Sequence, residues 1–312
     1  MKKFQNNDTI SIKNFEDFFL VVFVLIDDTY NEFVPKTVAM RRNILDAKLS
    51  DSEIITISIC GELIGIDSEK SRHSFVKRNY KHLFPKIGCR TRFNRTRRNL
   101  LQVTELIREK FMDIFSVQNE TCYIIDSFPL PVCQFGRALF CDSFKEYGAD
   151  YGYCPSKKMH YFGYKVHALI TLDGYITSFT VTPASVDDRE GLRDLIAGHS
   201  GHTILADKGY IGDVLYDEMK SNGIILLALK RKNSKSQWPK DLRRTVFHHR
   251  RMVETSFSQL SEQLNAERVR AKSFQGLLTR LVCKVLAHNI CMIINNMLGR
   301  SMELSHIKQL VL

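Results

Sequence analysis

The chain has 312 residues, of which 44% are hydrophobic and 25% are charged, with 16 glycines and 7 prolines. This composition is typical of a soluble globular protein and excludes a disordered or fibrous one, and the length suits a small domain joined to a larger one. The formal net charge of +11 indicates a polyanionic partner, because Lys and Arg neutralise phosphates. We favour nucleic acid over an acidic membrane surface.

Two apolar stretches and the cysteines indicate the cellular compartment in which the protein lies. The N-terminal "FFLVVFVLI" is short and lacks a cleavage site, and "LLTRLVCKVLAHNICMIINNML" near the C-terminus carries Arg280, Lys284 and His288, so we interpret both as buried helices. The eight cysteines form no CxxC pair, and several lie in apolar runs, which is typical of reduced thiols. We therefore expect a cytoplasmic protein with no membrane span.

Residues 1–118 are predicted to form a mostly helical, basic domain. The stretch "LSDSEIITISICGELIGI" offers Ser50 or Ser52 as an N-cap before an apolar run. Between residues 72 and 110 there are twelve Lys and Arg but only two acids, Glu105 and Glu109. Such a one-sided charge pattern favours a polyanion-facing surface, although a solvated basic face is the alternative.

The densest part of this basic region is "RTRFNRTRRNL". On a helix, Arg90, Arg97 and Arg98 would lie on or near one face, with Phe93 and Leu100 turned inward, as a DNA-docking helix requires. The candidate DNA contacts of this domain are Arg90, Arg92, Arg95, Arg97 and Arg98.

Strands and helices alternate after residue 119. "TCYIID" is an apolar strand that ends on Asp126, and a polar and aromatic insertion follows at 127–160. "YFGYKVHALIT" and "YITSFTVTPA" around "LDG" predict a β-hairpin. "SVDDREGLRDLI" predicts a helix with Asp187 and Asp188 at its start, where the helix dipole favours negative charge, so we discount both as catalytic.

The remaining elements complete an α/β fold. They are the strand "TILAD", the helix "YIGDVLYDEMKSN", the strand "GIILLAL", a basic insertion at 230–246 and a long helix around "TVFHHRRMVETSFSQLSEQL". This order predicts a ribonuclease H-like mixed sheet flanked by helices over residues 119–298, with a tail at 299–312.

Three acids occupy positions that this topology brings together. Asp126 and Asp207 end parallel strands at one edge of the sheet, and Glu254 lies on the last long helix. Three carboxylates repel one another unless cations neutralise them, and Mg²⁺ prefers such oxygen ligands. We expect Gly209 to let the backbone turn sharply and Lys208 to meet a phosphate. The alternative is that each acid only caps a turn.

The chain resembles the DDE transposases of bacterial insertion sequences. The blocks "IIDS", "YFGYKVHALIT", "TPASVDDREGL", "LADKGYIG" and "HHRRMVETSFSQL" carry the resemblance over about residues 120–295. It implies that Asp126, Asp207 and Glu254 form the DDE triad and hold two Mg²⁺ or Mn²⁺ ions.

The last of these blocks departs from the signature that several relatives carry, which is Tyr-x2-Arg-x3-Glu-x6-Lys. Its positions here are Phe247, Arg250, Glu254 and Ser261. Arg and Glu match, whereas the tyrosine hydroxyl and the lysine are missing, so we do not transfer those two DNA contacts and place the chain in a divergent branch.

The basic insertion and its neighbours supply further candidate DNA contacts. "KRKNSKSQWPKDLRRTVFHHRR" holds nine Lys and Arg and a single acid. The candidates are Lys208, Lys230, Arg231, Lys232, Trp238, Arg243, Arg244, Arg250 and Arg251. Trp238 could stack on a base, but we favour loop packing for it. We assign His248 and His249 to the basic surface, because the His and Cys spacing matches no zinc pattern.

The resemblance implies a transposase that binds terminal inverted repeats, cleaves double-stranded DNA at the element ends and joins them to a target by two-metal phosphoryl transfer. It also implies a homodimer on DNA in the bacterial cytoplasm, associated with the nucleoid. Two alternatives stay open: a nuclease or resolvase of the same fold that cleaves without joining, and a domesticated DNA-binding protein.

Overall fold

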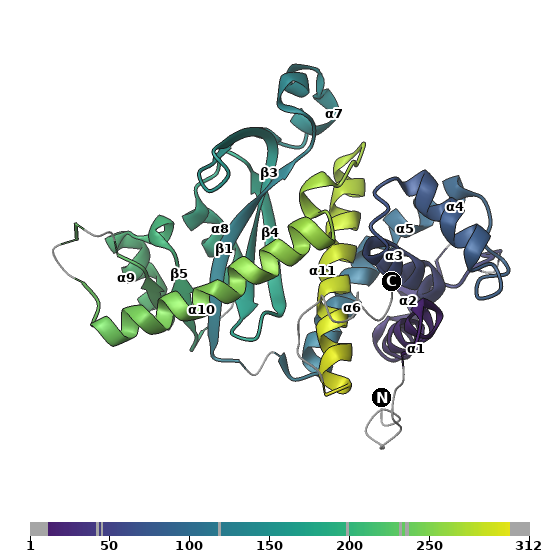
Figure 1. Ribbon diagram of the computed structural model, residues 1–312, viewed down its shortest axis with the longest axis horizontal. Coiled ribbons are helices and arrows are strands. Elements are labelled where there is room, and N and C mark those ends of the chain that lie inside the picture. The colour runs from purple at the N-terminus through teal and green to yellow at the C-terminus, as the bar shows by residue number, and fades with distance from the viewer. Residues whose placement is uncertain are drawn as a thin grey trace. The chain divides into compact units, whose positions relative to one another are not determined.

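The computed structural model describes residues 12–41, 44, 46–117, 120–197, 200–230, 233–234 and 237–299. The chain divides into two compact units, one of residues 1–115 with 262–312 and the other of residues 116–261 (Figure 1). We call them the helical unit and the sheet unit. The boundary at the N-terminal side lies close to the predicted one, whereas residues 262–298, which we expected in the α/β domain, belong to the helical unit.

The helical unit confirms the predicted helical character of the N-terminal region. Ser50 is the N-cap, and it forms a capping box with Glu53. The helices are α1 (Phe15–Phe33), α2 (Lys36–Ala39), α3 (Asp51–Leu63), α4 (Glu69–Asn79), α5 (Arg90–Asn99), α6 (Leu101–Ile114) and α11 (Phe274–Met297).

Helix α5 presents a different face from the predicted one. Phe93 is buried as expected, but Arg97 is buried with it and forms an ion pair with Glu69 on α4. The prediction that Arg97 faces DNA is therefore wrong, because an internal carboxylate captures its guanidinium. Arg90 stays exposed and Arg98 is half-buried.

Helix α11 is buried along almost its entire length, although it carries Arg280, Lys284 and His288 at intervals of four residues. It is long and apolar enough to cross a membrane, yet 94% of its most apolar stretch is buried inside the protein, as expected for a core helix. It packs against α3, α5 and α6.

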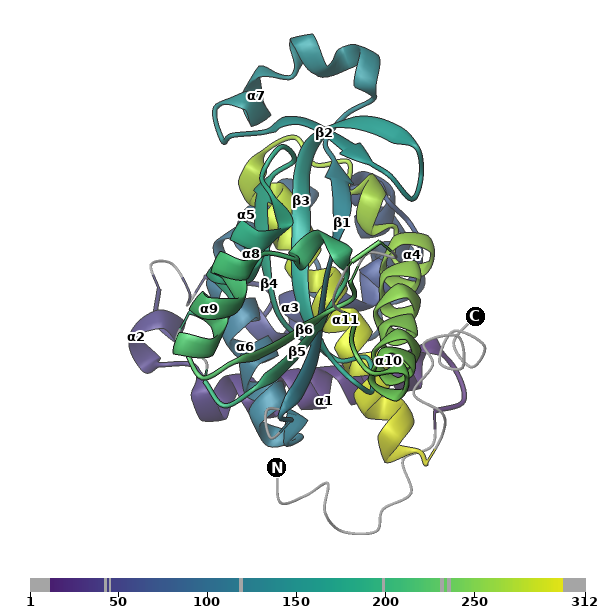
Figure 2. The same cartoon turned by 90° about the vertical axis from the view of Figure 1, so that its left-hand side faces the viewer.

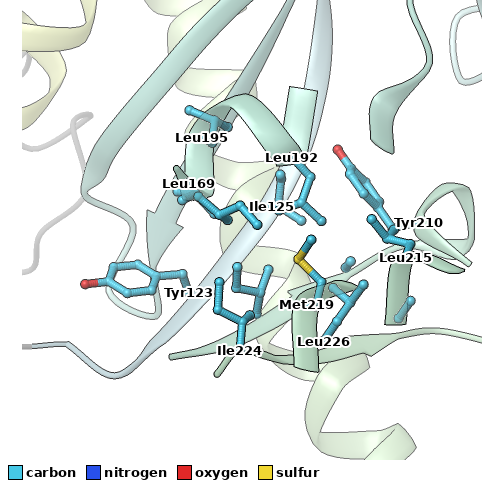
Figure 3. Packing of buried hydrophobic residues seen from close by; sticks show 14 residues of the cluster. Tyr123, Ile125, Leu169, Leu192, Leu195, Tyr210, Leu215, Met219, Ile224 and Leu226 are labelled. Carbon is cyan, nitrogen blue, oxygen red and sulfur yellow. The ribbon is translucent and has the colours of Figure 1, made fainter. Parts of the chain in front are cut away.

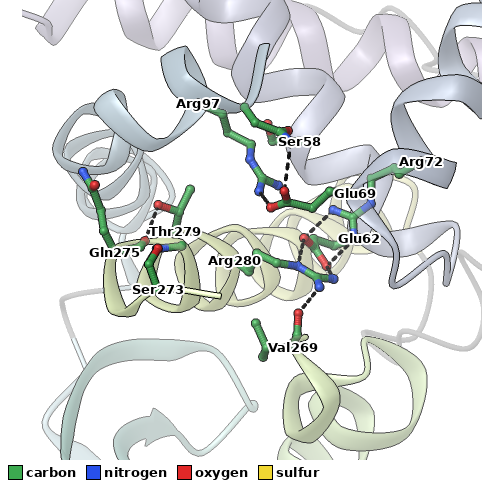
Figure 4. Close-up of polar contacts among 12 residues, drawn as sticks. Ser58, Glu62, Glu69, Arg72, Arg97, Val269, Ser273, Gln275, Thr279 and Arg280 are labelled. Atoms are coloured by element: carbon green, nitrogen blue, oxygen red, sulfur yellow. Dashed lines mark hydrogen bonds and ion pairs between the residues drawn. The ribbon is translucent and has the colours of Figure 1, made fainter. Parts of the chain in front are cut away.

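A buried ionic network fastens α11 to α3 (Figure 4). Glu62 is fully buried and accepts hydrogen bonds from Arg280 Nη2 at 3.0 Å, Lys284 Nζ at 2.6 Å and Arg72 Nη2 at 3.2 Å. Burial alone would raise the pKa of Glu62, but these three cations hold it well below its usual range. Further N–H groups of these cations donate to backbone carbonyls. For example, the Asp67 carbonyl accepts a hydrogen bond from Arg280 Nη1 at 3.0 Å.

The sheet unit contains one mixed sheet with the strand order β2-β3-β1-β5-β6, and β4 also pairs with β3. Strand β1 pairs antiparallel with β3 and parallel with β5, and β5 pairs parallel with β6. The strands are β1 (Cys122–Pro131), β2 (Asp150–Cys154), β3 (Met159–Thr171), β4 (Ile176–Pro183), β5 (Thr203–Ala206) and β6 (Ile225–Ala228). The predicted hairpin and parallel strands are present, and the fold is ribonuclease H-like as expected.

The polar and aromatic insertion is more regular than its sequence indicates. It extends β1 through Pro131 and adds the strand β2 at the edge of the sheet. Between them lie a short 3-10 helix at Phe135–Phe140 and the helix α7 (Asp142–Lys145).

Helices cover both faces of the sheet: α8 (Asp188–Ile196) and α9 (Asp213–Ser221) on one face and α10 (Lys240–Ser258) on the other (Figure 2). Tyr123 and Ile125 of β1 belong to the core beneath α8 and α9 (Figure 3). Because side chains alternate along a strand, Asp126 and Phe128 project towards different layers from Ile125 and Ser127. Phe128 stacks edge to face on Phe257 of α10, which assigns Asp126 to the α10 face.

The Glu62 network generates a stability prediction. Glu62→Gln leaves three buried cations without their counter-charge, so we expect it to lower the free energy of unfolding by about 3–5 kcal/mol. The control is Glu109→Gln on the exposed side of α6, which should change it by less than about 0.5 kcal/mol. Urea unfolding followed by circular dichroism measures both, and equal stability of the two variants would contradict the role given to Glu62.

Candidate active site

The register of the sheet places Asp126 and Asp207 at equivalent positions along two neighbouring strands. In the parallel β1–β5 pair, Cys122 lies opposite Thr203 and Ile124 opposite Leu205. Asp126 and Asp207 each lie two residues beyond that last pair. Asp207 directly follows β5, whereas β1 does not end at Asp126 as predicted but continues to Pro131. Both acids lie beyond the carboxyl end of the parallel pairing, where open α/β sheets place their sites. The β1–β5 pairing stops there, so β1 continues with only β3 beside it. This free side explains why β1 tolerates Pro129 and Pro131.

Asp126 is held in place from two sides. Its Oδ1 accepts the Ser127 N–H at 2.8 Å, and its Oδ2 lies 3.4 Å from Arg250 Nη2 on α10. Burial is the main cause that raises the pKa of Asp126 to about 6. The Ser127 N–H and Arg250 oppose this, and the carboxylates of Asp207 and Asp188 add to it. Three carboxylates that lie close together repel one another, so a cation bound at this edge of the sheet would stabilise their ionised forms.

Asp207 follows β5 and begins a short 3-10 turn, Lys208–Tyr210. Its Oδ1 accepts the Gly209 N–H at 2.6 Å, so it does cap a turn, as the alternative interpretation held. The reason for Gly209 differs from the predicted one: its φ is not in the left-handed region, but a Cβ there would lie 2.9 Å from Asp207 Oδ1. The glycine therefore makes room for the carboxylate. Lys208 is exposed, as a phosphate contact requires.

Glu254 lies on α10 between two residues that contact β1. Arg250, one turn earlier, reaches Asp126, and Phe257, three residues later, packs on Phe128. The Glu254 side chain is exposed, and within the part of the chain that the structure describes it makes no hydrogen bond or ion pair. No three metal-binding side chains among those residues lie close enough to hold one ion. The structure thus brings Asp126 and Asp207 together and leaves Glu254 on the adjacent helix.

Asp188 is a site residue that the sequence analysis discounted. It does lie at the start of α8, but its Oδ1 accepts hydrogen bonds from Ser127 Oγ and Lys165 Nζ, each at 3.0 Å. Its Oδ2 lies 3.6 Å from the position of a Cβ on Gly209. Asp188 therefore connects β1, β3 and the turn after β5 around Asp126 and Asp207. Only the spacing in "DDREG" could have drawn attention to it, and a helix start explains that spacing equally well.

Two buried aromatic residues, His167 and Tyr210, lie near Asp188. His167 is fully buried, its Nε2 lies 2.8 Å from Thr182 Oγ1, and burial lowers its pKa to about 4. Helix α8 packs directly on this ring, because a Cβ on Gly191 would lie 2.3 Å from it. The phenol of Tyr210 is also fully buried, and no hydrogen-bonding partner for its hydroxyl is present among the described residues. Burial and the nearby carboxylates raise its pKa well above the usual range.

The predicted DNA contacts of the basic insertion have different surroundings. The Trp238 indole donates to the Ala228 carbonyl at 2.9 Å and lies under the Lys230 ammonium, 4.6 Å from the ring centroid, which supports packing rather than base stacking. Arg231 and Lys232 lie outside the described residues. Arg243, Arg244 and Arg251 are exposed on α10.

One family model matches the chain. It describes a transposase DDE domain and matches residues 118–290, which is more than half of the sequence. No curated protein and no solved structure matched the chain.

The buried His167 predicts a pH-dependent stability. Its pKa is lower in the folded state, so the unfolded chain binds more protons at acidic pH, and this contribution to stability is lost as the pH falls from about 6.5 to 4. We expect a loss of about 3 kcal/mol from this group over that window. His167→Gln should remove it, whereas Thr182→Val keeps the imidazole and should keep the pH dependence. Urea unfolding at pH 7 and pH 4.5 tests this, and a difference between wild type and His167→Gln that does not change with pH would contradict it.

Proposed function

The chain belongs to the transposase DDE domain family, whose members act on DNA and use divalent metal ions, and from this premise we propose that it is the transposase of a bacterial insertion sequence. It binds the terminal inverted repeats, cleaves DNA at the element ends and joins the ends to target DNA. The observation that carries the proposal is the position of Asp126 and Asp207, each two residues beyond the last pair of the parallel β1–β5 pairing.

The donor set of the site fits a divalent cation. Asp126, Asp207 and Asp188 influence one another electrostatically, and Asp126 is mostly buried with Arg250 as its partner. Carboxylate oxygens are the ligands that Mg²⁺ and Mn²⁺ prefer. Asp126, Asp207 and Glu254 would hold two such ions, which would supply activation of the attacking oxygen and stabilisation of the leaving oxygen in phosphoryl transfer.

Hydrogen bonds and packing within the chain position the carboxylates for this reaction. The Ser127 and Gly209 N–H groups fix one oxygen of Asp126 and of Asp207, so the second oxygen of each carboxylate serves the reaction. Arg250 and Phe257 fasten α10 to β1 on either side of Glu254. The Ser256 hydroxyl, which donates to the Gly174 carbonyl at 3.1 Å, anchors the end of α10 to the β3–β4 turn. Approach of Glu254 to the two aspartates completes the triad.

Exposed cations on both units supply the DNA contacts. On the sheet unit these are Lys208, Arg243, Arg244 and Arg251, with Arg250 able to exchange Asp126 for a phosphate. On the helical unit they are Arg90, Arg92 and Arg95, together with the half-buried Arg98. The enzyme acts as a homodimer, in which two copies pair the two element ends, and works in the cytoplasm on nucleoid DNA. Binding to DNA therefore falls steeply with salt.

The triad predicts a separation of binding from chemistry. Asp126→Asn, Asp207→Asn and Glu254→Gln should each lower the rate of metal-dependent cleavage by about 10²-fold or more, since each removes a ligand charge. DNA affinity should be retained or improved, because a negative charge facing phosphate is lost. Gel assays of cleavage and joining on end-containing DNA, with Mg²⁺ and a target plasmid, measure the rates, and Asp194→Asn on the exposed side of α8 is the control.

Three outcomes would count against this proposal. Cleavage without joined product at any end sequence indicates a nuclease or resolvase. DNA binding without metal-dependent cleavage by the wild type indicates a domesticated binding protein. Full cleavage by Asp207→Asn would exclude the assigned triad.

Asp188 should act as a positioning residue. Asp188→Asn weakens the contacts with Lys165 and Ser127 and should lower the cleavage rate by about 10- to 100-fold, as for residues that orient metal ligands. The Mg²⁺ concentration needed for half-maximal cleavage should rise, which a loss of fold would not cause in the surviving activity. Asp194→Asn again serves as the matched control, and an unchanged Mg²⁺ requirement would contradict the assignment.

A further inference from the structure

The helical unit contains a groove of about 500 Å³ that the active site does not use. Its walls come from the start of α4, from one side of α5 and from residues 270–273, which lead into α11. Two parts of the sequence that are more than 150 residues apart thus meet in one concave surface. Only the first of them was predicted to contact DNA.

Five basic side chains line the groove: Lys70, Arg90, Arg98, Arg270 and Lys272. Four of them are exposed, and Arg98 is half-buried. None forms an ion pair with an acid within the described ranges, in contrast to Arg97 and Arg280 of the same unit. Unpaired cations on a concave surface repel one another, and an anion in the groove relieves this repulsion.

The acids of the groove do not neutralise these cations. Glu69 lines the groove, but the fold already uses both of its oxygens: Arg97 binds Oε1, and Asn94 Nδ2 donates to Oε2 at 2.9 Å (Figure 4). Asp67 is the other acid. Five basic side chains therefore face a single carboxylate, that of Asp67, which has no cation partner among the residues that the structure describes, so the groove is strongly positive.

The helix starts add to this potential. Helix α11 has 24 residues and no acid in its first turn, and its N-cap Ser273 and Gly276 line the groove. Helix α5 also lacks an acid in its first turn. The positive ends of both helix dipoles thus lie beside the five cations, where they favour negative charge.

We propose that this groove binds the phosphodiester backbone of duplex DNA, with Arg270 and Lys272 as contacts alongside Arg90 and Arg98. A single small anion neutralises only one or two of the five positive charges. Several phosphates linked in one backbone can neutralise cations that come from three segments of the chain. The inference rests on the proposed function, which makes DNA the substrate, and it identifies where the helical unit holds that DNA.

The test is the salt dependence of binding to a fluorescently labelled duplex, measured by anisotropy with the full-length protein. Each lost phosphate contact lowers the slope of log K against log salt concentration by about 0.9, so Arg270→Ala/Lys272→Ala should lower it by about 1.8. The control Lys13→Ala/Lys36→Ala removes two exposed lysines of the same unit outside the groove and should leave the slope unchanged. Arg270→Lys/Lys272→Arg should also retain it, which separates charge from folding.

Two results overturn the proposal. One is an unchanged slope and affinity for Arg270→Ala/Lys272→Ala. The other is displacement of the duplex by inorganic phosphate beyond the effect of chloride at equal ionic strength, which indicates a site for a single anion. These results can be told apart from failure of the proposed function. If the wild type binds DNA and Arg270→Ala/Lys272→Ala has an unaltered slope, only the groove proposal is excluded. If the wild type does not bind DNA, both proposals are excluded.

Discussion

The candidate site depends on where β1 and β5 stop pairing. The two strands pair in parallel through Ile124 and Leu205 and then separate. Asp126 and Asp207 each lie two residues beyond this last pair, so they occupy equivalent positions along the two strands. Hydrogen bonding within the sheet fixes these positions, and a slip of one residue would turn Asp126 to the opposite face. The antiparallel partner β3 extends along all of β1 beyond this point and keeps the edge rigid.

Charge is distributed unevenly within each unit. In the sheet unit, three aspartates gather at one edge of the sheet, with Arg250 and Lys165 as their cationic partners. In the helical unit, the buried Glu62 is surrounded by three cations, and the surface groove carries five more. Like charges held together in a folded protein cost free energy, which binding of the opposite charge offsets. In the function proposed here, a metal cation offsets the first group of charges and a polyanion offsets the second, and both ligands are needed for phosphoryl transfer on DNA.

The sequence predicts the elements that carry the acids better than it predicts their surroundings. Asp126 and Asp207 end apolar runs, and the order of elements is enough to make those runs neighbouring parallel strands. Arg97 was misassigned because its burial depends on Glu69, a residue 28 positions earlier whose partner no local pattern reveals. Asp188 was discounted because a helix start accounts for its charge, while its bond to Ser127 spans 61 residues. Helix α11 joins the helical unit through contacts such as those of Arg280 and Lys284 with Glu62, which no local pattern in the sequence reveals.

The central claim is that Asp126, Asp207 and Glu254 bind the same pair of divalent ions. The most direct measurement is a crystal structure of the protein with cleaved end DNA and Mn²⁺, in which anomalous scattering locates the ions. The account predicts two anomalous peaks at direct coordination distance from carboxylate oxygens of all three residues. Peaks bound by Asp126 and Asp207 while Glu254 stays in solvent, or peaks at another part of the sheet, would contradict it.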